Sequence, residues 1–250
     1  NRLKIKMDFN GQTVINPIDS KKGSIQVNWL HGAIAKNLTT NIEMKLSSGR
    51  TSFEDYRGYS FDDPAKNFYS NNETVYNGKT SPEGTIQFSP VIKVRNNAPG
   101  MLNVNFKTRV FEEGGDFSVD NFSIKYSPFN SYVGVKVPEG KGWNGALYSN
   151  EKNMVPIVCV DSDGNPVDRA NILVEVFDLR WRWWWERSNN NDLASYVANK
   201  SANLIHSSVV NTKNGKANYP LEFNKNLYGR KLIRITDPVS GHSTGQIFYL

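Results

Sequence analysis

The sequence has few of the residues that catalysis, metal binding and disulfide cross-linking need. It contains one cysteine, Cys159, and three histidines among 250 residues. A single cysteine cannot form an internal disulfide, so cysteine content does not decide the cellular compartment. His31, His206 and His242 are far apart and lack ligand spacing with Cys, Asp or Glu, so each is predicted to be a surface or turn residue. We therefore expect no metal and no cofactor.

The sequence also lacks the motifs of common enzyme classes. No Gly-x-Ser-x-Gly elbow, phosphate-binding loop or dinucleotide fingerprint is present. Residues 161–166 (Asp-Ser-Asp-Gly-Asn-Pro) have carboxylates at calcium-loop spacing, but the sixth-position glycine and the later glutamate are missing, which favours a solvated turn. The pairs Asp62-Asp63 and Glu112-Glu113 lie in turn-forming surroundings and are predicted to be solvated loop charges. These absences predict a protein that is not an enzyme.

Long runs of charge and of apolar residues are missing too. The formal net charge is +6, but no charge run exceeds Lys21-Lys22 and acidic residues are interspersed. A phosphate-binding surface needs clustered basic residues, so we expect no nucleic-acid partner. No segment approaches the roughly 20 apolar residues of a membrane span, so we expect no membrane contact by these residues. The chain starts at Asn1 without a signal peptide and ends in a strand-like segment, from which we infer a piece of a longer protein.

The sequence does contain many short segments in which apolar and polar residues alternate, separated by turn residues. This pattern predicts an all-β protein. In the first half, strands are predicted at residues 2–10, 23–30, 41–46, 84–94, 102–111 and 117–126. In the second half, they are predicted at residues 132–137, 154–160, 171–185, 207–211, 216–223, 231–236 and 244–250, with one short helix at 192–197. This spacing is typical of antiparallel β-sandwiches of about seven strands each.

The chain is long enough for two such domains, and a Pro-containing junction at residues 126–130 separates them. We predict one sandwich over residues 1–126 and a second over 127–250. Residues 47–82 show no regular alternation of apolar and polar residues, and they are rich in Tyr, Phe, Ser, Asn and Gly. This segment is predicted to be a long aromatic loop insertion of the first domain, ordered and packed over a sheet edge.

Four of the six tryptophans lie in one window of the second half: Trp181, Trp183, Trp184 and Trp185. Burying each ring removes roughly 150–250 Å² from water, so we expect these residues, with Trp29, to have a structural or interface role. A platform on which Trp181, Trp183 and Trp185 stack sugar rings is the alternative, and it corresponds to a tandem carbohydrate-binding module.

The same strand predicts a β-bulge. Ile172, Val174 and Val176 place apolar side chains on one face, whereas Phe177 and Leu179 continue the apolar pattern at the opposite parity. One extra residue in a strand moves every later side chain to the other face, so we expect a bulge near Val176 and Phe177.

Three segments resemble the bacterial alpha-2-macroglobulin family. Residues 25–38 are similar to the strand–turn–strand of a macroglobulin domain. Tyr126-Ser127-Pro128-Phe129, followed by Tyr132-Val133-Gly134, is similar to the junction between consecutive domains. The segment from Trp181 to Arg187 is the most specific of the three, since it resembles a tryptophan-rich strand of the middle domains. The resemblance covers nearly the whole chain.

This resemblance implies a large protease trap built from a string of macroglobulin domains, a bait region and, usually, a reactive thioester. The family's thioester needs cysteine, any residue, glutamate and glutamine, but Cys159 is followed by Val-Asp-Ser. The resemblance therefore implies scaffold domains, with bait and thioester chemistry outside this fragment. The implied partners are neighbouring macroglobulin domains and, through the full-length protein, target proteases. The implied location is periplasmic or at the cell surface, with the parent anchored as a lipoprotein.

Overall fold

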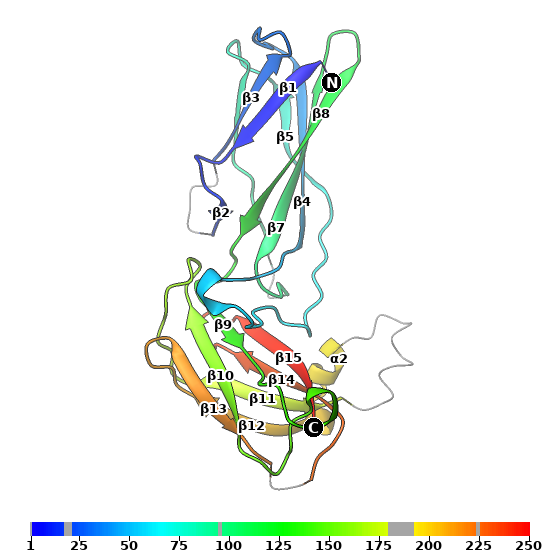
Figure 1. The fold of residues 1–250 in the computed structure, drawn as a ribbon. Helices are drawn as coiled ribbons and strands as arrows, with labels where there is room; N and C mark the ends of the chain where they lie inside the picture. The colour runs from blue at the N-terminus through cyan, green and yellow to red at the C-terminus, as the bar shows by residue number, and fades with distance from the viewer. Residues whose placement is uncertain (1, 18–21, 95–96, 180–192, 224–225) are drawn as a thin grey trace. The chain divides into compact units, whose positions relative to one another are not determined.

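The computed structural model describes residues 2–17, 22–94, 97–179, 193–223 and 226–250. These residues form two compact units built from β-sheets, which are drawn in Figure 1. The strand pairs are antiparallel except for one short parallel pair, Val14 and Ile15 with Lys125 and Tyr126. The first unit contains residues 1–49, 68–95 and 102–128, and the second contains residues 50–67, 96–101 and 129–250. The observed division differs from the predicted one because two short segments within the first half of the sequence belong to the second unit.

The first unit pairs a three-stranded sheet with a five-stranded one. The smaller sheet has the order β1 (Leu3–Asp8), β3 (Gly23–Trp29), β6 (Thr85–Phe88). The larger has the order β2 (Val14–Ile15), β8 (Phe117–Tyr126), β7 (Leu102–Phe111), β4 (Thr39–Ser48), β5 (Glu73–Lys79). Phe9, Phe88 and Phe106 are buried and pack their rings against one another, so aromatic side chains fill much of this core.

The strand β5 lies within residues 47–82, which are predicted to be an irregular loop, so its presence corrects that prediction. It pairs with β4 at the edge of the larger sheet, with a register shift between Ile42 and Glu43. All of its side chains are exposed or only partly buried. An edge strand without a buried face carries no alternating hydrophobic pattern, which is why periodicity did not reveal it.

The second unit is also a two-layer sandwich, as Figure 1 shows. One sheet has the order β13 (Lys216–Leu221), β10 (Asn153–Val160), β9 (Tyr132–Val135). The other has the order β12 (Leu204–Val210), β11 (Ile172–Asp178), β14 (Arg230–Thr236), β15 (Ser243–Tyr249). The predicted short helix is confirmed as α2 (Leu193–Ala198), which is followed by α3 (Lys200–Asn203); its predicted cap, Asp192, lies outside the described residues.

A hydrophobic core lies between the two sheets of the second unit. It contains Cys159, which is fully buried, as predicted for a small core residue. The other members come from both sheets and alternate along their strands with outward-facing residues, as a sandwich requires. They include Val133, Val135, Val155, Ile157, Ile172, Val174, Val176, Leu221, Ile233 and Ile235.

The predicted β-bulge is confirmed, but its mechanism differs from the prediction. The pairing of β11 with β12 shifts register between Val176 and Phe177, and the extra residue, Ile205, lies on β12. The strand β11 stays in register with β14 through Asp178, so its own side chains keep alternating. The apolar pattern changes parity because the outer face of this sheet is buried as well: Phe177 and Leu179 pack in a second cluster with Leu193, Leu232 and Ala65.

Candidate functional site

Residues 50–67, here called the strap, belong to the second unit although they lie between segments of the first unit in the sequence. The strap begins with extended residues, makes one turn of 3-10 helix, η1 (Glu54–Tyr56), and then runs along the sandwich. Three of its aromatic side chains, Phe53, Tyr56 and Phe61, are buried. Their cluster includes Tyr132, Val158 and Val160, which belong to β9 and β10. These aromatic residues, predicted to belong to a loop of the first domain, therefore cover a sheet of the second unit.

Backbone hydrogen bonds attach the strap to the sheet. Ser60 and Val135 exchange both of their backbone hydrogen bonds, at 2.8 and 3.0 Å, so the strap adds one antiparallel bridge to β9. The hydroxyl of Thr244, on β15, donates to the carbonyl of Ser60 at 2.8 Å. The strap thus bonds to one edge strand from each sheet, and covering two edges in this way leaves fewer unpaired backbone groups.

Gly134 explains why Phe61 fits against β9. A Cβ atom at this position would lie 2.5 Å from Cε1 of Phe61 and 2.9 Å from Cγ2 of Val158, which is too close for any side chain. The glycine therefore leaves the space that the Phe61 ring occupies. A glycine between β-branched residues in Tyr132-Val133-Gly134-Val135 was the sequence signal for this contact, because an isolated glycine in a strand often marks a close approach.

A buried ion pair fixes the far end of the strap. Oδ2 of Asp63 accepts hydrogen bonds from Nε and Nη2 of Arg234, at 3.0 and 2.8 Å, and from the hydroxyl of Ser243 at 2.6 Å. Oδ1 accepts the backbone N–H of Ala65 at 3.0 Å. The Asp63 side chain is fully buried, so the prediction of a solvated loop charge was wrong for this residue.

The electrostatics of Asp63 follow from these contacts. Burial alone would raise its pKa, but the hydrogen bonds and charge of Arg234, with the bonds from Ser243 and Ala65, hold the pKa below its usual value. Asp63 is therefore ionised at neutral pH in spite of its burial. The same arginine approaches Glu175, whose other carboxylate oxygen pairs with Lys200 of α3, so the outer face of this sheet carries a connected set of charges.

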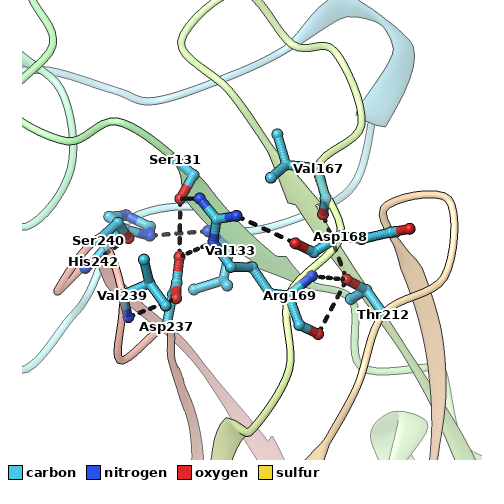
Figure 2. Close-up of polar contacts among 10 residues, drawn as sticks. All are labelled: Ser131, Val133, Val167, Asp168, Arg169, Thr212, Asp237, Val239, Ser240 and His242. Atoms are coloured by element: carbon cyan, nitrogen blue, oxygen red, sulfur yellow. Dashed lines mark hydrogen bonds and ion pairs between the residues drawn. The ribbon is translucent and has the colours of Figure 1, made fainter.

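A second polar cluster, shown in Figure 2, lies where the β14–β15 turn meets the start of β9. Asp237 is fully buried. Its Oδ2 accepts one hydrogen bond from the hydroxyl of Ser131, at 2.8 Å, and another from Nε of Arg169, at 3.2 Å. Nη2 of Arg169 also donates a hydrogen bond to the Ser131 hydroxyl at 3.0 Å, so Ser131, Arg169 and Asp237 all contact one another. The backbone N–H of Arg169 donates to Thr212 at 2.8 Å, so the cluster connects segments from across the unit.

His242 is fully buried beside this cluster, so the prediction of a surface or turn residue was right about the turn and wrong about the surface. Its Nδ1 accepts the backbone N–H of Val133 at 3.0 Å, as Figure 2 shows. Its ring lies 4.9 Å from Phe129 and 4.7 Å from Tyr132, between centroids. A ring that accepts this N–H through Nδ1 is neutral, with its proton on Nε2.

Ser131, His242 and Asp237 lie close together but do not form a hydrolase triad. In such a triad the histidine bonds to the serine hydroxyl and the aspartate orients the histidine. Here the Ser131 hydroxyl donates directly to Asp237, and Nδ1 of His242 is occupied by the backbone of Val133. All three side chains are buried from solvent. The arrangement holds the fold in place and offers no nucleophile to a substrate.

Of the five tryptophans predicted to have a structural or interface role, only Trp29 lies in the described part of the chain. Trp29 lies at the end of β3, half-buried, with its ring stacked near His31 at 6.3 Å. Trp181, Trp183, Trp184 and Trp185 lie outside the described residues, so the structural role and the sugar platform predicted for them both stay predictions.

No group of three or more His, Cys, Asp or Glu side chains in the described part of the chain could hold a metal ion. The candidate calcium loop at residues 161–166 is a hydrogen-bonded turn. Oδ1 of Asp161 accepts the backbone N–H groups of Asp163 and Asn165, both at 2.9 Å, and Oδ2 accepts the Asn165 amide at 3.0 Å. Across the same described ranges, no helix has the length and apolar character needed to span a membrane.

The pKa of His242 predicts a pH-dependent stability. Burial, with the positive charge of Lys66 nearby, lowers its pKa to about 3, against about 6.5 in an unfolded chain. Between these values the unfolded chain binds a proton that the folded chain does not, so stability is lost as the pH falls. From pH 6.5 to 4.5 the loss from this residue is about 2–3 kcal/mol. Urea titrations at both pH values should show it.

The matched variant is His242→Asn, whose side-chain carbonyl can accept the N–H of Val133 in place of Nδ1. Asparagine does not titrate, so the variant should lose about 2 kcal/mol less than the natural sequence between the same two pH values. Equal losses in both proteins would contradict the assignment of the effect to His242.

Cys159 supplies a second prediction. Burial, with the negative charge of Asp237, raises its pKa to about 12, so almost no thiolate forms at neutral pH. We expect the folded chain to react with Ellman's reagent at least about 10³-fold more slowly than the urea-unfolded chain, since reaction requires the second unit to open. Comparable rates in the two states would show that the thiol is accessible in the native protein.

Comparisons with known proteins bear on both units. Residues 1–122 match the family model described as the bacterial alpha-2-macroglobulin MG5 domain, and residues 134–250 match the model of bacterial macroglobulin domain 6. No curated protein sequence matches the chain. The two models together cover almost all of the sequence and place the fifth and sixth domains in order.

Solved structures show the same fold. Trypsin-activated alpha-2-macroglobulin from Escherichia coli superposes with a TM-score of 0.64 at 17% identity, over 100% of this chain and 16% of that one. The native conformation of the E. coli protein gives 0.62 at 14% identity, with the same coverage of both chains. Salmonella alpha-2-macroglobulin reacted with methylamine gives 0.56 at 13% identity, over 99% of this chain and 16% of that one.

At identities this low, the superpositions show similarity of fold, and the chain spans about a sixth of the length of these solved structures, 16% in each case. The family models supply the more specific information, because they match consecutive segments of the sequence itself. The chain therefore belongs to the bacterial alpha-2-macroglobulin family, as a fragment that contains its fifth and sixth macroglobulin domains.

Proposed function

We propose that this chain is the structural scaffold of a bacterial protease trap and carries no bait or thioester chemistry of its own. The observation that supports this most directly is the pair of family matches, which identify consecutive macroglobulin domains. The single cysteine supports it too, since Cys159 is buried in a hydrophobic core and is not followed by the residues of a thioester motif. A buried thiol in that setting cannot present an activated acyl group to a protease.

The strap gives the scaffold a physical role. Residues 50–67 lie in the sequence between segments of the first unit, yet they complete the second unit with buried aromatic rings and an ion pair. The chain therefore passes repeatedly between the two units, where a simple tandem repeat has a single linker. We propose that this connectivity lets the pair respond as one element when a protease cuts the parent chain elsewhere.

The proposed partners are the neighbouring macroglobulin domains of the parent chain and, through the parent, the proteases that it meets. The solved E. coli relatives are described as activated by trypsin and by porcine elastase, which makes these enzymes suitable probes. The proposed location is outside the cytoplasm, in the periplasm or at the cell surface, with the parent anchored as a lipoprotein.

The test compares the parent-length protein with the 250-residue chain. Each is incubated with trypsin, and the remaining activity is measured on a small chromogenic peptide and on a large protein substrate. A small peptide can diffuse to an enclosed protease, whereas a large protein substrate cannot. The parent should therefore suppress activity on the large substrate only. The 250-residue chain should suppress neither. Inhibition by the 250-residue chain alone would overturn the scaffold proposal, as would a parent that leaves both activities unchanged.

A further inference from the structure

The second unit has a cavity of about 510 Å³ that none of the roles above uses. It lies beside η2 (Trp143–Gly145) and the end of β15. This volume is within the range of sites that bind small ligands. Its lining residues are Gly142, Trp143, Asn144, Ala146, Leu147, Tyr148, Tyr249 and Leu250.

Three aromatic rings of this lining are exposed. Trp143 is 92% exposed, and Tyr148 and Tyr249 are each nearly half exposed, at 47% and 46%. Leaving an indole in water forgoes several kcal/mol of burial free energy, so exposure of this degree, grouped around a hollow, is typical of a binding surface.

The loop that carries Trp143 is ordered by its own hydrogen bonds. The backbone N–H of Gly140 donates to Gly145 at 3.0 Å, and that of Gly142 donates to Ala146 at 2.9 Å. The N–H of Leu147 donates to the carbonyl of Tyr249 at 2.9 Å, which ties the loop to β15. The exposed ring is thus presented on a preorganised loop, and a ligand that binds it does not have to order the backbone first.

The chemistry of the lining selects the kind of ligand. None of its lining residues is Lys, Arg, His, Asp or Glu, and the nearby guanidinium of Arg230 lies over the Tyr249 ring, 5.9 Å from its centroid, so the lining itself offers no charge to a charged ligand. Each aromatic residue combines an apolar face with a polar hydrogen, on the indole nitrogen or the phenol oxygen, and Asn144 adds an amide. A hydrocarbon ligand would leave these polar groups without partners, and a nucleic acid would lack cations for its phosphates.

We propose that this cavity binds a neutral oligosaccharide. A pyranose ring presents C–H groups on one face, which pack against an aromatic ring, and hydroxyl groups at its edge, which pair with phenol, indole and amide groups. The proposal is independent of the protease-trap function. It is also distinct from the sugar platform predicted for Trp181, Trp183 and Trp185, because it uses a different tryptophan on a different part of the chain.

The experiment follows the indole N–H signals of the 250-residue chain by ¹H–¹⁵N NMR. Cellohexaose, chitohexaose and maltohexaose are titrated separately, and the Trp143 signal is assigned by its loss in the Trp143→Ala variant. We expect the Trp143 signal to move in a saturable way with at least one of the three sugars. The Trp143→Ala variant should bind that sugar at least tenfold more weakly. The control is Tyr69→Ala, which removes a ring that is 79% exposed in the first unit and should leave binding unchanged.

Three results would overturn the proposal. The first is the absence of saturable movement with all three sugars at about 10 mM, a concentration that detects even weak binding. The second is movement of other indole signals while that of Trp143 stays in place, which would assign binding to another surface. The third is a Trp143 signal that depends on protein concentration alone, which would make the occupant a second protein molecule.

Discussion

Replacing Asp63 with alanine is expected to destabilise the second unit by about 3–5 kcal/mol, because Arg234 loses the nearer of its two buried carboxylate partners. Arg234 donates two hydrogen bonds to this carboxylate, and its side chain is only 15% exposed. Ser243 and the N–H of Ala65 lose their acceptor as well. Equilibrium urea unfolding at pH 7 measures the change.

Two further variants make this result specific to the buried ion pair. Glu54→Ala removes a carboxylate of the same strap, whose contact with Arg57 is fully in solvent at 3.9 Å, and should change stability by less than about 0.5 kcal/mol. The double variant Asp63→Leu, Arg234→Met replaces both charges with apolar groups and should recover most of the loss. An Asp63→Ala protein within about 1 kcal/mol of the natural sequence would show that the pair does not hold the strap.

Residues 129–250 alone are expected to fail to fold cooperatively at 25 °C, although they contain every strand of the second unit. Removing the preceding sequence removes Phe53, Tyr56 and Phe61 from the face of β9 and β10. Each buried aromatic ring contributes roughly 4–6 kcal/mol before entropy is counted, and a whole domain is stable by only about 5–15 kcal/mol. Circular dichroism on heating and the binding of a hydrophobic dye measure the effect.

The matched control is a polypeptide in which residues 50–67 are joined to the start of residues 129–250 through a glycine–serine linker. It restores the strap without the rest of the first unit, so it should regain a cooperative transition. If residues 129–250 alone melt cooperatively within a few degrees of the full chain, the strap is dispensable and does not complete the second unit.

The strands were predictable because the core of each sandwich lies on one face of most of them. In β7, for example, Leu102, Val104 and Phe106 are buried and alternate with partly exposed residues. Period-two patterning appears in the sequence wherever this geometry holds. It failed at the edge strand β5, which has no buried face, and it was misinterpreted at Val176 and Phe177, where both faces of the sheet are covered.

The strap and the polar clusters could not be located in the same way. Phe53 and Phe61 stand in an irregular segment, so their burial depends on tertiary contacts and leaves no period in the sequence. Asp63 and Arg234 are 171 positions apart, and a single sequence gives no reason to pair them. His242 follows a turn, where a solvated histidine is the usual expectation, and only the packing of Phe129 and Tyr132 around it shows otherwise.

Native-state hydrogen exchange at the amide of Ser60 measures whether residues 50–67 are an integral part of the second unit. The N–H of Ser60 is bonded to the carbonyl of Val135 on β9. We expect Ser60 to exchange only when the second unit opens as a whole, with the same opening free energy as the amides of β10. Exchange of Ser60 at the rate of an exposed loop, while β10 stays protected, would contradict this expectation.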